Sequence, residues 1–216
     1  MKPLAASRLY TFVDAAYLNG RSPVEVAQQL CDGGSDLLQL RAKNASPDEI
    51  QRLAEALLPV TERAGVALVI NDHPKIALSV GAAICHLGQE DFYEAGYTVA
   101  AQVTGCPKQM LLGLSTHAPE QALRALRASP DYLAIGPIYP TPTKPGRPGV
   151  TLDYVRWAAA NLRLPWFAIG GITLDNLDAV LAAGARRICV VSAILNASDL
   201  AKACQQFQTR LASVPL

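Results

Sequence analysis

Two hydroxyl groups and one ammonium group lie within four residues of each other, at Thr141, Thr143 and Lys144. They follow the apolar run 132–135, which is typical of a short buried strand. Prolines separate or flank these residues and fix the backbone φ angle, so the segment is partly preorganised. Hydroxyls and a lysine held at the C-terminal end of a strand are suited to binding phosphate oxygens. The alternative is an ordinary surface turn rich in proline and glycine.

Three further polar side chains occupy alternate positions earlier in the chain. Gln39, Arg41 and Lys43 are separated by Leu40 and Ala42, and a period of two places the polar side chains on one face of a strand. Charges on an inward face are costly unless a counter-charge meets them, and an anionic substrate would supply one. The alternative is that the two basic side chains reach solvent or pair with structural acids.

Two carboxylates follow the next two apolar runs. Asp72 comes after Asn71 at the end of the run 67–70, and Asp91 follows the run 83–87. Two carboxylates beside phosphate-binding groups are suited to Mg²⁺, which takes oxygen ligands and bridges substrate phosphates. Taken singly, Asp91 is also explained as a helix N-cap and Asp72 as a turn residue.

The later apolar runs also end in residues that suit an anion. Ser115 follows the run 110–114, Gly171 belongs to a glycine pair after the run 166–169, and Val191 precedes Ser192 where the run 188–191 ends. Glycine lets the backbone approach a ligand closely, and the N–H groups at the start of a helix attract anions. Ser115 has an ordinary alternative as a helix cap.

These residues follow eight short apolar runs that alternate with amphipathic stretches. Ser22 and Ser46 each begin a capping box followed by proline, Thr173 and Gly184 bound another predicted helix, and 199–211 is the last. The stretch 92–104 has the poorest helical pattern. Strands alternating with helices predict parallel βαβ units, and eight units predict a (β/α)8 TIM barrel, with a doubly wound open sheet as the alternative. The predicted strands are 9–13, 37–41, 67–70, 83–87, 110–114, 132–135, 166–169 and 188–191.

The composition narrows the class of protein. The net charge of the 216 residues is +1 and no basic stripe stands out, which argues against a nucleic-acid partner. No apolar run is long enough to span a membrane, and the first residues lack the pattern of a signal peptide. Five cysteines without CxxC spacing suit a reduced protein, and Cys85 and Cys189 are expected to fill the core. We therefore expect a cytoplasmic protein with one barrel domain over 1–216.

The strand-end motifs, taken in order, resemble those of the thiamine-phosphate synthase family. The resemblance covers nearly the whole chain, and the ordered combination is far more specific than any single motif. The matching segments are QLRAK at 39–43, ND at 71–72, HLGQED at 86–91, GLS at 113–115, GPIY at 136–139, TPTK at 141–144, IGGI at 169–172 and VS at 191–192.

This resemblance implies a (β/α)8 enzyme that binds two phosphorylated small molecules. It would join a hydroxymethylpyrimidine diphosphate to a thiazole phosphate, releasing pyrophosphate, and also CO2 when the thiazole is carboxylated. By the same likeness the metal is Mg²⁺, held by Asp72 and Asp91. The pyrimidine diphosphate would be held by Gln39, Arg41, Lys43, Asn71, Ser115 and Lys144. The thiazole phosphate would be held by Thr141, Thr143, Gly171, Val191 and Ser192.

Two rival functions stay open at this point. One is the related thiazole tautomerase, an isomerase for which His117 would be a candidate; the other is a barrel that binds the same ligands without turnover. Ala83 and Ile84 stand where the family usually has Asp-Gly, so a carboxylate and a flexible residue are missing near the fourth predicted strand. The sequence assigns no role to the loop around Arg147 and does not decide whether the chain forms a homo-oligomer. For His73 and His86 we expect structural or solvent-facing roles.

Overall fold

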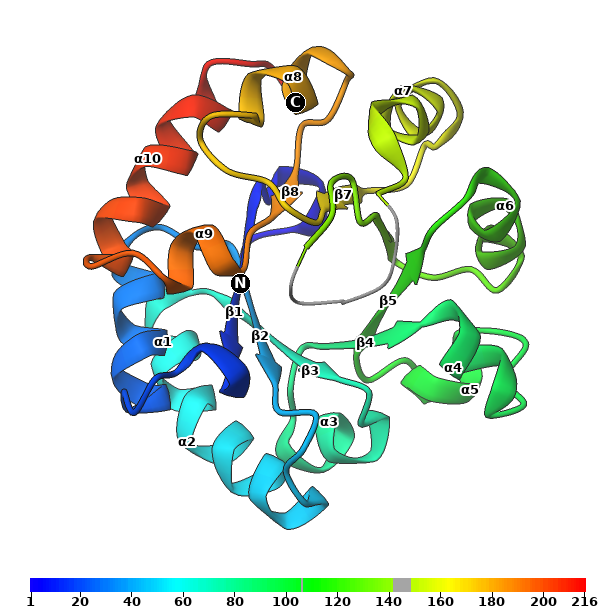
Figure 1. Ribbon diagram of the computed structural model, residues 1–216. Helices are drawn as coiled ribbons and strands as arrows, with labels where there is room; N and C mark the ends of the chain where they lie inside the picture. The colour runs from blue at the N-terminus through cyan, green and yellow to red at the C-terminus, as the bar shows by residue number, and fades with distance from the viewer. Residues whose placement is uncertain (106, 142–148) are drawn as a thin grey trace.

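Eight parallel strands form a closed barrel in the order of the sequence in this computed structural model, which describes residues 1–105, 107–141 and 149–216 (Figure 1). Each strand is hydrogen-bonded to the next, and β8 closes the ring by pairing Ile188 with Leu9 of β1. The strands are β1 Leu9–Asp14, β2 Leu37–Arg41, β3 Ala67–Asn71, β4 Ile84–Gly88, β5 Leu111–Thr116, β6 Tyr132–Ile135, β7 Trp166–Ile169 and β8 Ile188–Cys189.

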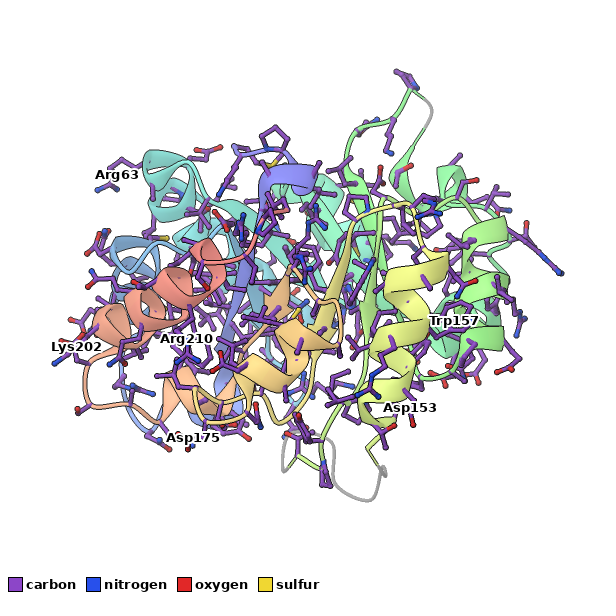
Figure 2. The ribbon with its side chains drawn as sticks, turned by 90° about the horizontal axis from the view of Figure 1, so that it is seen from above. Arg63, Asp153, Trp157, Asp175, Lys202 and Arg210 are labelled. Atoms are coloured by element: carbon purple, nitrogen blue, oxygen red, sulfur yellow. The ribbon has the colours of Figure 1, made fainter. Side chains whose placement is uncertain are left out.

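Helices surround this barrel on the outside (Figure 1). The outer surface carries charged side chains, as the labelled Arg63, Asp153 and Lys202 in Figure 2 illustrate. The helices are α1 Pro23–Asp32, α2 Pro47–Ala64, α3 Pro74–Val80, α4 Gln89–Glu94, α5 Ala101–Thr104, α6 Pro119–Arg127, α7 Thr151–Asn161, α8 Leu177–Ala182, α9 Ser192–Leu195 and α10 Leu200–Ala212, with 3-10 turns at Leu4–Ala6 and Ala15–Tyr17. No helix in the described ranges is long and apolar enough to cross a membrane.

The helix starts follow from local sequence. Ser46 and Glu49 form a complete capping box at α2, and Gly65 ends that helix with a φ of +68°. At α1, Ser22 accepts a hydrogen bond from the backbone of Glu25. Asp199 does the same for Lys202 at α10. These side chains satisfy N–H groups that the first turn of a helix leaves without partners.

The strands β1, β3, β4 and β5 and the last helix, α10, differ from the predicted boundaries by one or two residues at an end. Three other differences concern the turn at Thr173, the end of β8 and the stretch 92–104. The predicted helix at Thr173 begins only at Leu177, because the Asn176 side chain accepts from the Thr173 N–H at 2.9 Å and holds a turn there. β8 ends at Cys189 rather than at the predicted Val191, because Val191 is already the N-cap residue of α9. The weakly patterned stretch 92–104 contains parts of two short helices, α4 and α5.

The barrel interior is filled with aromatic rings. Tyr10 and Phe12 of β1 stack with their centroids 5.1 Å apart, and Phe167 of β7 meets Tyr10 edge-on at 5.5 Å. Tyr132 of β6 completes this cluster, and its side chain is fully buried. The filled interior forms a solid floor, so a ligand has access only at the open end above it.

Candidate functional site

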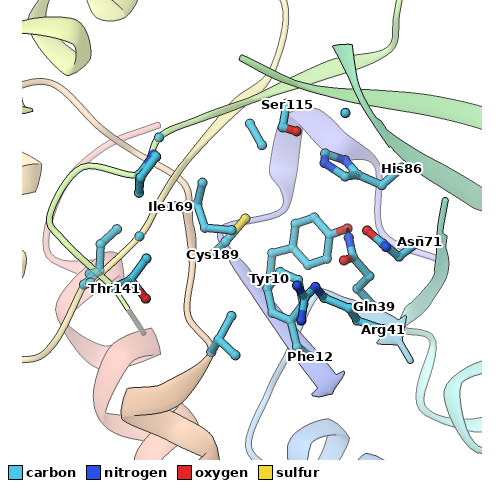
Figure 3. Close-up of a pocket in the computed structure, with 18 of the residues that line it drawn as sticks. Tyr10, Phe12, Gln39, Arg41, Asn71, His86, Ser115, Thr141, Ile169 and Cys189 are labelled. Atoms are coloured by element: carbon cyan, nitrogen blue, oxygen red, sulfur yellow. Dashed lines mark hydrogen bonds between the residues drawn. The ribbon is translucent and has the colours of Figure 1, made fainter. Parts of the chain in front are cut away.

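A pocket opens at the C-terminal ends of the strands, above the aromatic floor (Figure 3). Most of the residues predicted from the sequence to form a site line this one pocket. They are Gln39, Arg41, Lys43, Asn71, Asp72, Asp91, Ser115, Thr141, Gly171, Val191 and Ser192. Thr143, Lys144 and Arg147 lie outside the described residues. The barrel thus brings together side chains that are up to 153 residues apart in the sequence, from Gln39 to Ser192.

The basic side chains at the end of β2 pair with acids at the ends of the neighbouring strands β1 and β3. Arg41 Nη1 lies 2.7 Å from Oδ2 of Asp14, which ends β1 and is almost completely buried. Lys43 Nζ lies 3.8 Å from Asp72 Oδ2. Both cations line the pocket, and each has a carboxylate as a counter-charge. Arg41 therefore pairs with a structural acid, as the alternative from the sequence predicted, and it also lines the pocket. The partner of Lys43 is itself a pocket residue.

Two carboxylates reach the pocket from β3 and α4. Asp72 has a φ of +63°, and its Oδ2 accepts from the Asn71 side chain at 2.6 Å. Asp91 is the third residue of α4 and folds back over Gly88, where an added Cβ would lie 2.5 Å from its Oδ2. Gly88 therefore leaves the space that the Asp91 carboxylate occupies. Across the described part of the chain, no cluster of three or more His, Cys, Asp or Glu side chains could hold a metal.

This pair nevertheless fits Mg²⁺. Both ligands are carboxylates, they line the same pocket, and the Asp91 carboxylate rests in a cradle that a Cβ would fill. Mg²⁺ is usually bound by one or two carboxylates, with water and substrate phosphates completing its shell. A pair without a third protein ligand is therefore the expected donor set for a metal shared with a diphosphate.

Two histidines also line the pocket. His86 of β4 is buried, and its Nδ1 lies 2.9 Å from the Tyr132 hydroxyl, so its role is structural in part and it does not face bulk solvent. His117 follows β5; its Nδ1 contacts the carbonyl of Gly136 and its Nε2 lies 3.8 Å from Glu90. These contacts hold both rings at the pocket wall.

Backbone groups form the side of the pocket between β7 and β8. Gly170 and Gly171 have φ angles of +105° and +63°, and a Cβ on Gly171 would lie 2.7 Å from the Cβ of Tyr139. The segment after β6 pairs with this turn, since Ile138 N–H donates to the Ile169 carbonyl at 2.8 Å. Ser192 begins α9 at the neighbouring strand end. Glycines at 170–171 are therefore required by the close approach of two loops.

Several pocket residues were not identified from the sequence. Tyr10 and Phe12 line the floor, but aromatic residues inside a strand are typical of any core. Cys189 is buried as predicted and also lines the pocket. Burial raises the pKa of its thiol well above the usual value, so it stays protonated. Asp14 does not line the pocket but pairs with Arg41, which does. It could have been found, because it follows an apolar run as the other polar strand-end residues do.

A profile of the family described as thiamine monophosphate synthase matches residues 9–194 of this chain. The match begins at the first residue of β1 and ends inside α9, so it spans the whole barrel. The chain belongs to this family. The family and the transferase function predicted from the strand-end motifs are thereby confirmed.

Individual relatives agree with the family assignment. A thiamine-phosphate synthase from Thermus thermophilus is 50% identical over 185 residues, which are 84% of this chain and 85% of the relative. One from Acidothermus cellulolyticus is 43% identical over 212 residues and covers 97% of both chains. The solved thiamine phosphate pyrophosphorylase of Pyrococcus furiosus superposes with a TM-score of 0.79 at 26% identity, covering 95% of this chain and 96% of the other. The predicted (β/α)8 barrel is confirmed, and the open sheet is excluded.

The departure from the family at Ala83 and Ile84 lies away from the pocket. Ile84 is the first residue of β4 and is fully buried between Val69 and Leu111 of the neighbouring strands. The pocket lies at the other end of the same strand, at Gly88. An apolar pair at this position therefore packs into the barrel wall and leaves the strand-end geometry intact.

Proposed function

We propose that the pocket binds 4-amino-2-methyl-5-hydroxymethylpyrimidine diphosphate beside a thiazole phosphate and joins the two rings. The observation that supports this most directly is that one pocket combines a basic side on β2 with a glycine-rich backbone side between β7 and β8. Each side is suited to one phosphorylated group. The small-molecule substrates implied by the family require such a pair of anion sites at a single opening.

The diphosphate would meet the charged side of the pocket. Arg41 and Lys43 supply positive charge from β2, Asn71 and Ser115 supply hydrogen-bonding groups, and Gln39 lies at the floor beneath the ring. Lys144, outside the described residues, completes this predicted set. The thiazole phosphate would meet the other side, with Thr141, Gly171, Val191 and Ser192, together with Thr143 from the segment that is not described.

Mg²⁺ would be held by Asp72 and Asp91, and would neutralise negative charge on the leaving pyrophosphate. Asp72 lies beside Lys43 and Asn71, and Asp91 lines the same pocket. Arg41, Lys43 and the metal would place positive charge beside the negative charge that develops on the leaving group. This would lower the barrier of the reaction without a covalent bond to the protein.

The reaction needs no protein nucleophile. The bond between the methylene carbon and the diphosphate oxygen breaks first, and the electron-rich aminopyrimidine delocalises the resulting positive charge. Pyrophosphate leaves in this first step with the electrons of the broken bond. The thiazole nitrogen then donates its electron pair to the methylene carbon and forms the new carbon–nitrogen bond. The protein's contribution is to hold both rings in one water-poor pocket and to stabilise the leaving group. The protonated thiol of Cys189 agrees with a non-covalent role for the floor.

The coupling assay tests this proposal. Purified protein, Mg²⁺, the pyrimidine diphosphate and the thiazole phosphate should together yield thiamine phosphate and an equal amount of pyrophosphate. Isomerisation of the thiazole without coupling would instead establish the tautomerase, and ligand binding without any product would establish a non-catalytic barrel. We also propose a cytoplasmic location and no nucleic-acid partner, as the composition predicts.

Replacing one proposed metal ligand separates function from stability. Asp91→Ala should lower the coupling rate by roughly 100-fold, because a charge-stabilising group acts mainly in the transition state. Since Asp91 is exposed, the free energy of unfolding of the variant should differ from that of the wild-type protein by less than about 0.5 kcal/mol. Asp153→Ala, which removes an exposed carboxylate paired with Arg156, is the matched control and should keep full activity. A loss of activity that only tracked unfolding would mean that Asp91 is structural.

A further inference from the structure

Four polar side chains form a continuous hydrogen-bonded row across the barrel floor. Gln39 Nε2 donates to the Tyr10 hydroxyl at 2.5 Å, and the Tyr10 and Tyr132 hydroxyls lie 3.1 Å apart. Tyr132 in turn lies 2.9 Å from His86 Nδ1. Gln39, Tyr10 and His86 line the pocket, as Figure 3 shows, whereas Tyr132 lies among the fully buried core residues. The row therefore connects two sides of the pocket through a residue beneath it.

The register of the strands makes this row possible. His86 of β4, Gly113 of β5 and Tyr132 of β6 are paired in one line across three strands. A Cβ on Gly113 would lie 2.0 Å from the Tyr132 ring, so the ring crosses the space that a side chain there would fill. Phe167 packs edge-on against Tyr10 and against Tyr132, each at 5.5 Å. Both tyrosine rings are therefore held in place by packing.

Each tyrosine in the row has one proton to donate. Burial raises the pKa of Tyr10 and of Tyr132 well above the usual value, so both stay neutral. The Tyr10 hydroxyl accepts from the Gln39 amide and contacts the Tyr132 hydroxyl, and either hydroxyl can donate in that second contact. The Tyr132 hydroxyl in turn contacts His86 Nδ1. With the Gln39 amide turned round, its oxygen would face Tyr10, and the Tyr10 hydroxyl would have to donate to it and accept from Tyr132. The two ends of the row are therefore linked.

We propose that Tyr10 and Tyr132 are positioning residues that hold the Gln39 amide with its Oε1 toward the bound pyrimidine. This rests on the proposed function. Within the described residues, Tyr10 is the side-chain hydrogen-bond partner of Gln39, and this bond uses the amide nitrogen. The oxygen that remains is an acceptor, which matches the amino group of the aminopyrimidine. A ring with an oxo group at that position would place two acceptors against each other, which leaves both unsatisfied.

Tyr132→Phe tests the proposal, because it keeps the ring and removes only the hydroxyl in the middle of the row. Calorimetric titration gives dissociation constants for the aminopyrimidine diphosphate and for its 4-oxo analogue, without the thiazole phosphate. The wild-type protein should prefer the amino compound. In Tyr132→Phe the preference should fall by about ten-fold, because the Gln39 amide is free to turn. Tyr10→Phe removes the hydroxyl that accepts directly from Gln39 and should lower the preference in the same way. It is the variant to measure if Tyr132→Phe does not fold.

Tyr154→Phe is the matched control. Tyr154 is also buried and its hydroxyl bonds to Thr116 at 2.7 Å, but it does not line the pocket. This variant should lose comparable stability and keep the wild-type preference. The positioning proposal is overturned if Tyr132→Phe keeps the wild-type preference, or if it weakens both compounds equally. A wild-type protein that binds neither compound and forms no product would overturn the proposed function itself, and this inference with it.

Discussion

Asp14 holds Arg41 at the mouth of the barrel. One carboxylate oxygen lies 2.7 Å from Arg41 Nη1, and the other accepts from the Ala16 N–H at 3.0 Å. Only 1% of Asp14 is exposed, so the guanidinium is paired with a carboxylate that is almost fully removed from water. Breaking such a pair is costly because the remaining charge is left without its partner. Asp14 thus provides the charge that balances Arg41 when no anion is bound.

Asp14→Asn should therefore destabilise the free protein and strengthen its response to an anion. The amide keeps the shape of the side chain, so we expect a loss of roughly 3 kcal/mol, from the lost ion pair. Thermal unfolding with and without Mg²⁺ and inorganic pyrophosphate measures both effects. The rise in Tm on adding pyrophosphate should be larger than in the wild-type protein, because the anion replaces the missing carboxylate beside Arg41. An equal or smaller rise would show that Arg41 does not meet the diphosphate.

At the scale of residues, the sequence predicted the polar side chains of the pocket better than its floor. Arg41, Lys43 and Asp72 stand out because charged residues at the ends of several successive apolar strands point to one shared site, although each has a structural explanation by itself. Tyr10 and Tyr132 do not stand out, since an aromatic residue in a strand is expected in any core. Their hydroxyl contacts depend on which strands face each other across the barrel, and this is set by the closed register rather than by local sequence.

At the scale of elements, α2 begins with a complete capping box and α1 does not. At α2 the Ser46 hydroxyl accepts from the Glu49 N–H at 3.3 Å, and the Glu49 carboxylate accepts from the Ser46 N–H at 2.7 Å. These bonds to Ser46 lower the pKa of Glu49. At α1 the bond from Glu25 N–H to Ser22 is 3.5 Å long. The two helices therefore offer a matched comparison of strong and weak capping.

Ser46→Ala should destabilise the protein by about 1 kcal/mol, and Ser22→Ala by less. The Tm of a chain of this length should fall by about 2–4 °C for the first variant. The difference should shrink in acid, because a carboxylate with a lowered pKa stabilises the fold above its unfolded pKa and loses this effect as the pH falls through the folded pKa. Equal losses for the two variants at neutral pH would mean that the second half of the box contributes nothing.

The same scale shows where sequence reasoning about elements failed. Thr173 looks like a helix start because hydroxyl and acidic residues follow one another there, but Asn176 bonds back to the Thr173 N–H and to the Gly171 carbonyl. A side chain that bonds to the nearby backbone competes with helix formation. Here the turn is formed instead of the helix, because the Asn176 side chain also bonds to the Gly171 carbonyl at the pocket. The eight strands were predicted well because buried parallel strands are apolar on both faces.

At the scale of the whole molecule, the barrel hides its described cysteines from solvent. Cys31, Cys85, Cys189 and Cys204 are all buried and free. Burial raises the pKa of Cys31 to about 11, and those of Cys85 and Cys204 to about 12. Thiols react as thiolates, so these side chains are poor nucleophiles while the protein is folded. The expectation that Cys85 and Cys189 lie in the core is met by their exposed fractions of 0% and 2%.

Alkylation with iodoacetamide at neutral pH should therefore report global unfolding. In the folded protein the peptides that contain these four cysteines should stay unmodified, and in concentrated guanidinium chloride all four should react. Mass spectrometry of the digested protein measures each site separately. Early labelling of Cys85 in the folded state would contradict a closed barrel, because Cys85 is fully buried and does not line the pocket. Early labelling of Cys204 alone would indicate that α10 detaches by itself.

The alignment of His86, Gly113 and Tyr132 in one register line also limits how this barrel can change over evolutionary time. Any side chain at 113 collides with the tyrosine ring, while a small residue at 132 leaves a void beside the glycine. A protein in which only one of the two positions has changed is therefore destabilised. Among related sequences, a glycine aligned with Gly113 and an aromatic residue aligned with Tyr132 should be inherited as a pair, and lineages that lose one should lose the other.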